Sequence, residues 1–236
     1  MGPATGIATQ VRTGRRRATD IVAAALEAAE QTHDDLNAFT LIDTSGAMHR
    51  AEAVDLMVDA GHDPGPLAGV PVALKDIIDD AGMPTTCGGS FPAPLAENSA
   101  TAVRRLGAAG AVIIGRTGLH EFAFGFTSEN PWFGPVRNPW DIRTSPGGSS
   151  GGSAVAVAAG IVPIGIGTDT GGSGRVPAAM CGVFGLKVTH GRIPLSGVFP
   201  LAASLDTVGP IARSVDDLTA TYLAMAGDDA SDPWSQ

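Results

Sequence analysis

The sequence has 236 residues, which is enough to bury a full hydrophobic core, and we expect one domain. Its formal net charge of −9 argues against a surface that holds nucleic acid phosphates, so no direct nucleic acid partner is expected. Cys87 and Cys181 are far apart and lack CxxC spacing, so neither a disulfide framework nor a zinc ribbon is indicated. Two reduced thiols are typical of a cytoplasmic protein.

No apolar run approaches the ~20 residues needed to cross a bilayer, because glycine, proline or charge interrupts every hydrophobic segment. Arg15, Arg16 and Arg17 look like the start of a twin-arginine export signal, but the pattern that follows carries Glu27 and Glu30 and has no clean apolar stretch. We interpret the arginines as a solvated turn before a helix, and we expect no membrane partner.

Residues 1–62 are predicted to form a helical N-terminal region. Apolar residues recur at helical spacing over residues 19–31, and Thr19 or Asp20 is expected to cap this helix. A short strand is predicted over residues 39–42, followed by turn residues and a second helix over residues 48–60.

Residues 63–227 are predicted to form the core, and residues 228–236 a tail. Strands are expected over residues 70–78, 111–115, 162–168 and 183–188, and helices over residues 99–110, 153–159 and 214–226. The alternation of these elements predicts an α/β fold in which a mixed, twisted sheet is covered by helices.

Two serines of the core are set among glycines: Ser149 in GGSSGG (residues 147–152) and Ser173 in TGGSGR (residues 170–175). Glycine permits positive φ and close approach to a ligand, so such serines can be presented beside bare backbone N–H groups. Lys75 lies in the apolar stretch VPVALKDII, where a lysine either reaches solvent or is buried with a lowered pKa.

These three motifs resemble those of the amidase signature family of serine hydrolases, and so do LNAF (residues 36–39), NPWD (138–141) and SLDTVGP (204–210). The resemblance covers nearly the whole chain. It implies an amidase that cleaves the carbon-nitrogen bond of a small-molecule amide through an acyl-enzyme, without a cofactor. It also implies a Ser-Ser-Lys triad, with Ser173 as nucleophile, Ser149 as bridging serine entered through a cis peptide bond, and Lys75 as base.

The resemblance assigns further roles around the triad. The backbone N–H groups of four residues are implied to form the oxyanion hole: Thr170, Gly171, Gly172 and Ser173. Ser150 is expected to support the proton path. Apart from the resemblance, Asp169 and Arg175 carry opposite charges beside Ser173, so we interpret them as an ion pair that fixes the nucleophile loop rather than as substrate-binding residues. The segment Phe124, Gly125 and Phe126 resembles the family's acyl-pocket loop, with ordinary aromatic packing as an equal alternative.

Two questions about the whole protein stay open at this point. The glutamine-amidase subunit of the tRNA-dependent amidotransferase has the same motifs, so amidotransferase partner subunits, a homodimer or a free amidase are all compatible with them. Family members continue considerably further, so we interpret the chain as an N-terminal part with an open sheet edge and exposed apolar surface. A folded but inactive fragment is the third possibility.

Other functional motifs fit less well. Residues 147–151 satisfy the GxSxG pattern of an α/β-hydrolase esterase, with Asp169 and His190 following Ser149 in triad order, but no strand precedes them. His120 and Glu121 do not start a metalloprotease motif, because the position of the second histidine holds phenylalanine, so no metal is expected. Cys87 has no basic neighbour that would activate it, so we interpret it as structural.

Overall fold

The structure is a computed structural model that describes all residues from 1 to 236. Its helices are α1 (Ala4–Arg12), α2 (Ala18–Gln31), α3 (His33–Leu36), α4 (Thr44–Asp59), α5 (Thr101–Ala108), α6 (Gly151–Ala158), α7 (Arg175–Cys181) and α8 (Val215–Met225), with a 3₁₀ turn, η1 (Glu121–Ala123). Its strands are β1 (Phe39–Ile42), β2 (Pro71–Lys75), β3 (Val112–Thr117), β4 (Ile164–Thr168), β5 (Phe184–Gly185) and β6 (Val208–Ala212).

The six strands form one mixed sheet in the order β1-β3-β2-β4-β6-β5. The central strand β2 runs parallel to both β3 and β4, whereas β1, β6 and β5 pair antiparallel with their neighbours. This arrangement confirms the predicted mixed α/β sheet. Because β2 and β4 are parallel neighbours, their carboxyl ends lie side by side. Ligands bind beyond the carboxyl ends of the strands in open α/β sheets.

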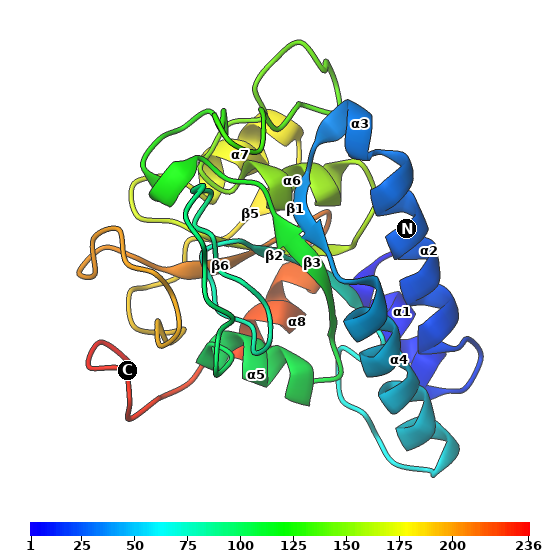
Figure 1. Cartoon of the computed structure of the whole chain (residues 1–236). Coiled ribbons are helices and arrows are strands. Elements are labelled where there is room, and N and C mark those ends of the chain that lie inside the picture. Colours follow the sequence, from blue (N-terminus) through cyan, green and yellow to red (C-terminus); the bar gives the residue numbers. More distant parts are fainter.

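Helices cover both faces of the sheet. Figure 1 shows α5 and α8 on one side of the sheet and α6 and α7 on the other. Helices α2 and α4 pack beside β3, and α1 contacts α4 and α8. The crossovers explain this division, because α5 leads from β2 to β3 on one side and α6 leads back across β2 to β4. Strands β2, β3 and β4 are consequently buried along their whole length.

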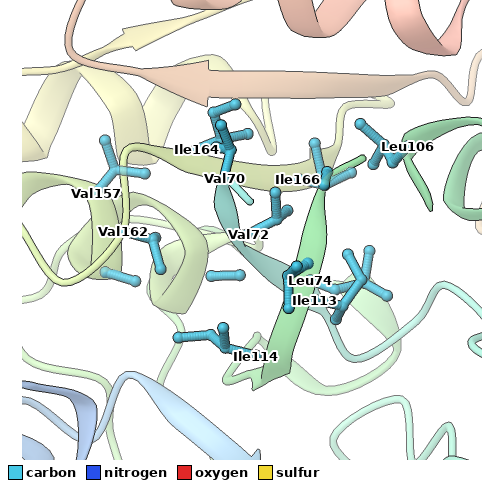
Figure 2. Packing of buried hydrophobic residues seen from close by; sticks show 14 of the residues in the cluster. Val70, Val72, Leu74, Leu106, Ile113, Ile114, Val157, Val162, Ile164 and Ile166 are labelled. Carbon is cyan, nitrogen blue, oxygen red and sulfur yellow. The ribbon is translucent and has the colours of Figure 1, made fainter. Parts of the chain in front are cut away.

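The core is built mainly from valine, isoleucine, leucine and alanine side chains, which come from the central strands and from the helices and connecting segments around them. Figure 2 shows Val72 and Leu74 of β2 close to Ile164 and Ile166 of β4, with other apolar side chains of the same cluster around them. Strands buried on both faces read as continuous apolar runs, which is why the sequence pattern located β2 and β4. The same pattern makes Lys75, at the end of β2, the exception.

Four elements were not predicted from the sequence: α1, α3, α7 and β6. Strand β6 lies between β4 and β5 and contains Pro210, a residue that argues against a central strand in a sequence. Helix α7 follows a glycine-rich loop and has Pro177 in its first turn, where proline is tolerated because the N–H there needs no helical partner. The strand predicted over residues 183–188 is only two residues long.

The capping predicted for α2 was wrong. Neither Thr19 nor Asp20 caps the helix, because α2 begins one residue earlier and its N-cap is Arg17. The free N–H groups of Ala18 and Thr19 instead donate to the carboxylate of Asp55 in α4, at 2.6 and 3.1 Å. A carboxylate from any element of the fold can accept hydrogen bonds from the free N–H groups at a helix N-terminus. The spacing of residues along the chain does not show which distant carboxylate does so. Helix α4 likewise begins in the predicted turn.

The edge of the sheet at β5 is unpaired and carries apolar side chains, as expected from the sequence. Phe184 of β5 is half-exposed, and Met180 of α7 and Trp140 are exposed as well. The indole N–H of Trp140 donates to the Cys181 carbonyl at 2.8 Å, which holds this ring against the end of α7. The exposed apolar surface therefore borders the elements that carry the glycine-rich serine motifs.

Candidate active site

Lys75 is the last residue of β2, and its side chain is fully buried. Its Nζ donates to Ser149 Oγ and to Thr168 Oγ1, at 2.7 Å in both cases. Thr168 is the last residue of β4, so the parallel pairing of β2 and β4 places these two strand ends together. The buried ammonium is thus held between two hydroxyl groups rather than beside a carboxylate.

Burial lowers the pKa of Lys75 from its ordinary value of 10.5 to about 7, because a buried ammonium loses its hydration. The charges of Asp169 and Asp206 oppose this effect, but neither carboxylate forms an ion pair with the lysine. Neutral Lys75 is therefore well populated at pH 7 and dominates above it. A lysine in this state is able to accept a proton from a hydroxyl group.

Ser149 lies in a turn that precedes α6. The peptide bond between Gly148 and Ser149 is cis, as the resemblance implies. Its neighbour Ser150 joins three parts of the site: the N–H donates to the Ser173 carbonyl at 3.0 Å, and the hydroxyl exchanges hydrogen bonds with the backbone of Thr168. Both serines are fully buried. The two serine motifs are therefore connected by the hydrogen bond between the Ser150 N–H and the Ser173 carbonyl.

The loop that carries Ser173 is held by Asp169. This carboxylate accepts hydrogen bonds from the backbone N–H groups of Gly172, Gly174 and Arg175, and from the Arg175 guanidinium at 2.9 and 3.0 Å. Burial raises the pKa of Asp169, but the hydrogen bonds from Arg175 and the loop outweigh that effect and hold the pKa below its usual value. The ion pair predicted between Asp169 and Arg175 is present.

The predicted oxyanion hole needs one correction. The N–H of Gly172 donates to Asp169 Oδ1 at 2.8 Å, so it is not free to bind a negative oxygen. The N–H groups of Thr170, Gly171 and Ser173 have no hydrogen-bond acceptor within the protein. Three of the four predicted donors therefore remain free, and Gly172 instead fixes the loop that presents them.

No hydrogen bond joins Ser149 Oγ to Ser173 Oγ, although Ser173 is only 3% exposed. Lys75 thus contacts Ser149 directly, and the proton path that the resemblance implies would need the two serines to approach each other further. Catalytic hydrogen bonds are often long without substrate and shorten in the complex.

The predicted pocket segment divides into two parts. The Phe126 ring lies beside the glycines of the nucleophile loop, since a Cβ built on Gly171 or Gly172 would meet it at 4.0 or 3.7 Å. Phe124 instead points to solvent and is 80% exposed, and Gly125 packs against the His120 ring. Phe126 is therefore the member of this segment that borders the path to Ser173.

The family model described as Amidase matches residues 20–236. The chain belongs to the amidase signature family. The resemblance of its motifs to that family is thereby confirmed over most of the chain.

Relatives within the family have different names. The chain is 47% identical over 236 residues to a glutamyl-tRNA(Gln) amidotransferase subunit from Rhodopirellula baltica, covering 98% of this chain and 47% of that protein. It is 45% identical to a 1-carboxybiuret hydrolase subunit from a Pseudomonas species, covering 94% of this chain and 49% of that protein. The native peptide amidase from Stenotrophomonas maltophilia superposes with a TM-score of 0.94 at 38% identity, covering 98% of this chain and 49% of that one. The chain thus spans about half the length of the curated relatives it matches.

The geometry of this amidase chain does not support the esterase alternative. Ser149 Oγ accepts a hydrogen bond from Lys75 and not from a histidine. His190 instead contacts the Ala203 carbonyl and the ring of Trp234. Asp169 is occupied by Arg175 and the nucleophile loop. The three residues of the GxSxG interpretation therefore do not form a triad.

Cys87 is buried, and burial raises the pKa of its thiol to about 12, which agrees with a structural role. No group of three or more histidine, cysteine, aspartate or glutamate side chains is close enough to hold a metal ion. None of the helices combines the length and the apolar character required to cross a membrane.

Thr168 is the site residue that sequence reasoning missed. A hydroxyl at the end of the apolar strand IGIGT is a weak signal, and its meaning depends on which strand lies beside it. The hydroxyl accepts from Lys75 and fixes the position of the amine relative to Ser149.

We expect Thr168→Val to lower the rate of Ser173 labelling by an alkyl fluorophosphonate by about 10- to 100-fold, because the lysine loses one of its two anchors. The midpoint of the pH-rate profile should also move to lower pH, since an acceptor that favours the charged amine is removed. Thr117→Val is the matched control, because its buried hydroxyl at the end of β3 contacts Ser153 and not Lys75. Equal rates in both variants would contradict this role of Thr168.

Proposed function

We propose that the full-length gene product hydrolyses the carbon-nitrogen bond of an amide through an acyl-enzyme formed on Ser173. The observation that carries this proposal is the buried Lys75, whose pKa is lowered to about 7 and whose Nζ is 2.7 Å from Ser149 Oγ. A structural lysine is rarely buried without a counterion, whereas a base must be neutral near the operating pH.

In the proposed first step, Ser173 Oγ attacks the amide carbonyl carbon. The Ser173 proton passes to Ser149, whose own proton passes to the neutral Nζ of Lys75. The ammonium that results stays buried between Ser149 and Thr168, which stabilises it as a temporary proton store. The proton then returns through Ser149 to the leaving nitrogen as the carbon-nitrogen bond breaks, and water hydrolyses the ester in a second cycle.

The negative oxygen of the tetrahedral intermediate is proposed to bind the free N–H groups of Thr170, Gly171 and Ser173. Backbone donors held in place beforehand stabilise developing charge without reorganisation, and one such donor contributes about 10²- to 10³-fold in rate. We propose that Asp169 and Arg175 support the hole by holding the N–H groups of Gly172, Gly174 and Arg175. Phe126 is proposed to line the path of the acyl group.

The names of the relatives favour two versions of this function. A free amidase that acts on a small-molecule amide is supported by the likeness to a peptide amidase and to the 1-carboxybiuret hydrolase protein. A glutamine-amidase subunit that passes ammonia to amidotransferase partner subunits is supported by 47% identity to the glutamyl-tRNA(Gln) amidotransferase protein. Both versions use the same site, and for both we propose action in the cytoplasm.

The two versions are separable with the full-length gene product purified from its native host. We expect release of ammonia or amine from simple amides and from glutamine, measured with and without any copurifying subunit. Turnover of simple amides by the isolated protein would favour the free amidase. Glutamine hydrolysis that appears only with a stoichiometric partner protein would favour the amidotransferase, and absence of both activities would contradict the proposal.

A further inference from the structure

Ser128 is a fully buried serine that lies outside the triad and outside the assigned supporting residues. It follows Phe126 by two residues, at the end of the segment that borders the nucleophile loop. Its backbone has φ of +54°, a left-handed conformation that non-glycine residues adopt rarely. Such a conformation at a buried position prompts the question of which contacts keep it there.

The Ser128 hydroxyl makes two hydrogen bonds to the turn that contains Ser149. It donates to the Ser149 carbonyl at 3.3 Å, and it accepts from the Gly151 N–H at 3.1 Å. The Ser149 carbonyl receives a second donor, the His120 N–H at 3.2 Å. A carbonyl oxygen has two lone pairs, so these two donors fully satisfy the carbonyl of the bridging serine.

The glycines of the Ser149 motif leave the space that Ser128 occupies. A Cβ on Gly148 would lie 2.8 Å from the Ser128 nitrogen and 2.9 Å from its Oγ. A Cβ on Gly151 would lie 2.3 Å from the same Oγ. None of these three distances is compatible with ordinary van der Waals contact, so glycine at both positions follows from the close approach of Ser128 as well as from the turn itself.

A second contact joins the same two segments. Ser145 Oγ donates to the Thr127 carbonyl at 2.7 Å and accepts from the Gly147 N–H at 3.0 Å. The segment that carries Phe126 is therefore hydrogen-bonded to the Ser149 turn before and after the cis peptide. The Phe126 ring of the same segment also borders Gly171 and Gly172.

We propose that Ser128 is a positioning residue for the bridging serine. By fixing the carbonyl of Ser149 and the N–H of Gly151, it sets the direction in which Ser149 Oγ points, toward Lys75 and toward Ser173. This inference rests on the proposed function, since it gives Ser128 a role in the proton path that links Lys75 to Ser173.

The test uses the full-length gene product and an alkyl fluorophosphonate, with the labelling rate at saturation and the half-saturating concentration measured from about pH 5 to 10. In Ser128→Ala we expect the saturating rate to fall by about 10- to 100-fold and the half-saturating concentration to stay within about twofold, because geometry is lost and probe binding is not. The midpoint of the pH profile should move to lower pH, since the hydrogen bond from Lys75 to Ser149 is loosened.

Two further variants separate the hydroxyl from the fold. Ser128→Gly removes the same hydroxyl but relaxes the strain of the positive φ, so it tests the hydroxyl even if Ser128→Ala folds poorly. We expect its saturating labelling rate to fall by the same factor. Ser153→Ala deletes another buried hydroxyl, whose partners are Thr117 and the Ile166 carbonyl, and it should label at close to the original rate and with an unmoved pH midpoint.

This inference would be overturned if both Ser128 variants were labelled at the saturating rate of the unsubstituted protein. It would also be overturned if the midpoint of their pH profiles moved no more than in Ser153→Ala. Labelling that survives Ser173→Ala would instead overturn the proposed function, whatever the Ser128 variants do. The two failures are therefore distinguishable in one set of experiments.

Discussion

Ser173→Ala is expected to abolish covalent labelling of the full-length gene product by an alkyl fluorophosphonate. The probe phosphonylates an activated serine with loss of fluoride, and Ser173 is the serine whose surroundings offer free N–H groups for the negative oxygen. Removing the attacking oxygen leaves no other group at that place, because the alanine side chain has no nucleophile. Gel fluorescence and mass spectrometry of the labelled peptide measure the result.

Cys87→Ala provides the control for this experiment. Cys87 is buried, and burial raises its pKa to about 12, so its loss should leave labelling of Ser173 unchanged. A contrary result has a clear form. If labelling persists in Ser173→Ala and disappears in Ser149→Ala, the nucleophile is Ser149 and the proposed order of the proton path is reversed.

Lys75→Met is expected to lower the rate of Ser173 labelling by about 10²- to 10⁴-fold, which is the usual contribution of a general base. Methionine keeps the length and the apolar character of the chain but accepts no proton. In the unsubstituted protein the rate should rise tenfold per pH unit below pH 7 and level off above it, because the pKa of Lys75 is about 7 and only its neutral form accepts the proton. In Lys75→Met this pH dependence should be absent.

The same substitution has a consequence for stability. Burial lowers the pKa of Lys75 in the folded state, so the unfolded state binds its proton more tightly and folding carries a penalty at low pH. The penalty is full below about pH 7 and disappears above the ordinary pKa of 10.5. It amounts to roughly 5 kcal/mol at most, since a pKa difference of one is worth about 1.4 kcal/mol.

We therefore expect the stability of Lys75→Met, relative to the unsubstituted protein, to be greatest at about pH 6 and to decline steadily toward pH 10. Urea unfolding across this range measures the difference, and shared titrations of other groups cancel in it. A difference that does not change with pH would mean that Lys75 is not buried as a neutral amine. Arg105→Met, which removes a cation that donates to the carbonyls of Met225 and Gly227 at the end of α8, should show no such trend.

The sequence by itself determined the family and the main strands, and it predicted the residues that we propose to react. Continuous apolar runs located β2, β3 and β4, because strands buried on both faces are apolar over most of their length. A single lysine at the end of such a run, and two serines among glycines, marked the chemistry. Residue type and local spacing are enough for these conclusions, since each depends on a short stretch of chain.

The tertiary structure decided which groups meet. Lys75 contacts Ser149 and Thr168, which are 74 and 93 residues away, and only the parallel pairing of β2 with β4 brings the two strand ends together. The same holds for the Gly172 N–H, which belongs to the predicted oxyanion hole but bonds to Asp169 once the loop closes on itself. A backbone hydrogen bond to a side chain depends on the path of the loop in space, and a lysine pKa depends on everything packed around it. Neither is a property of spacing along the chain.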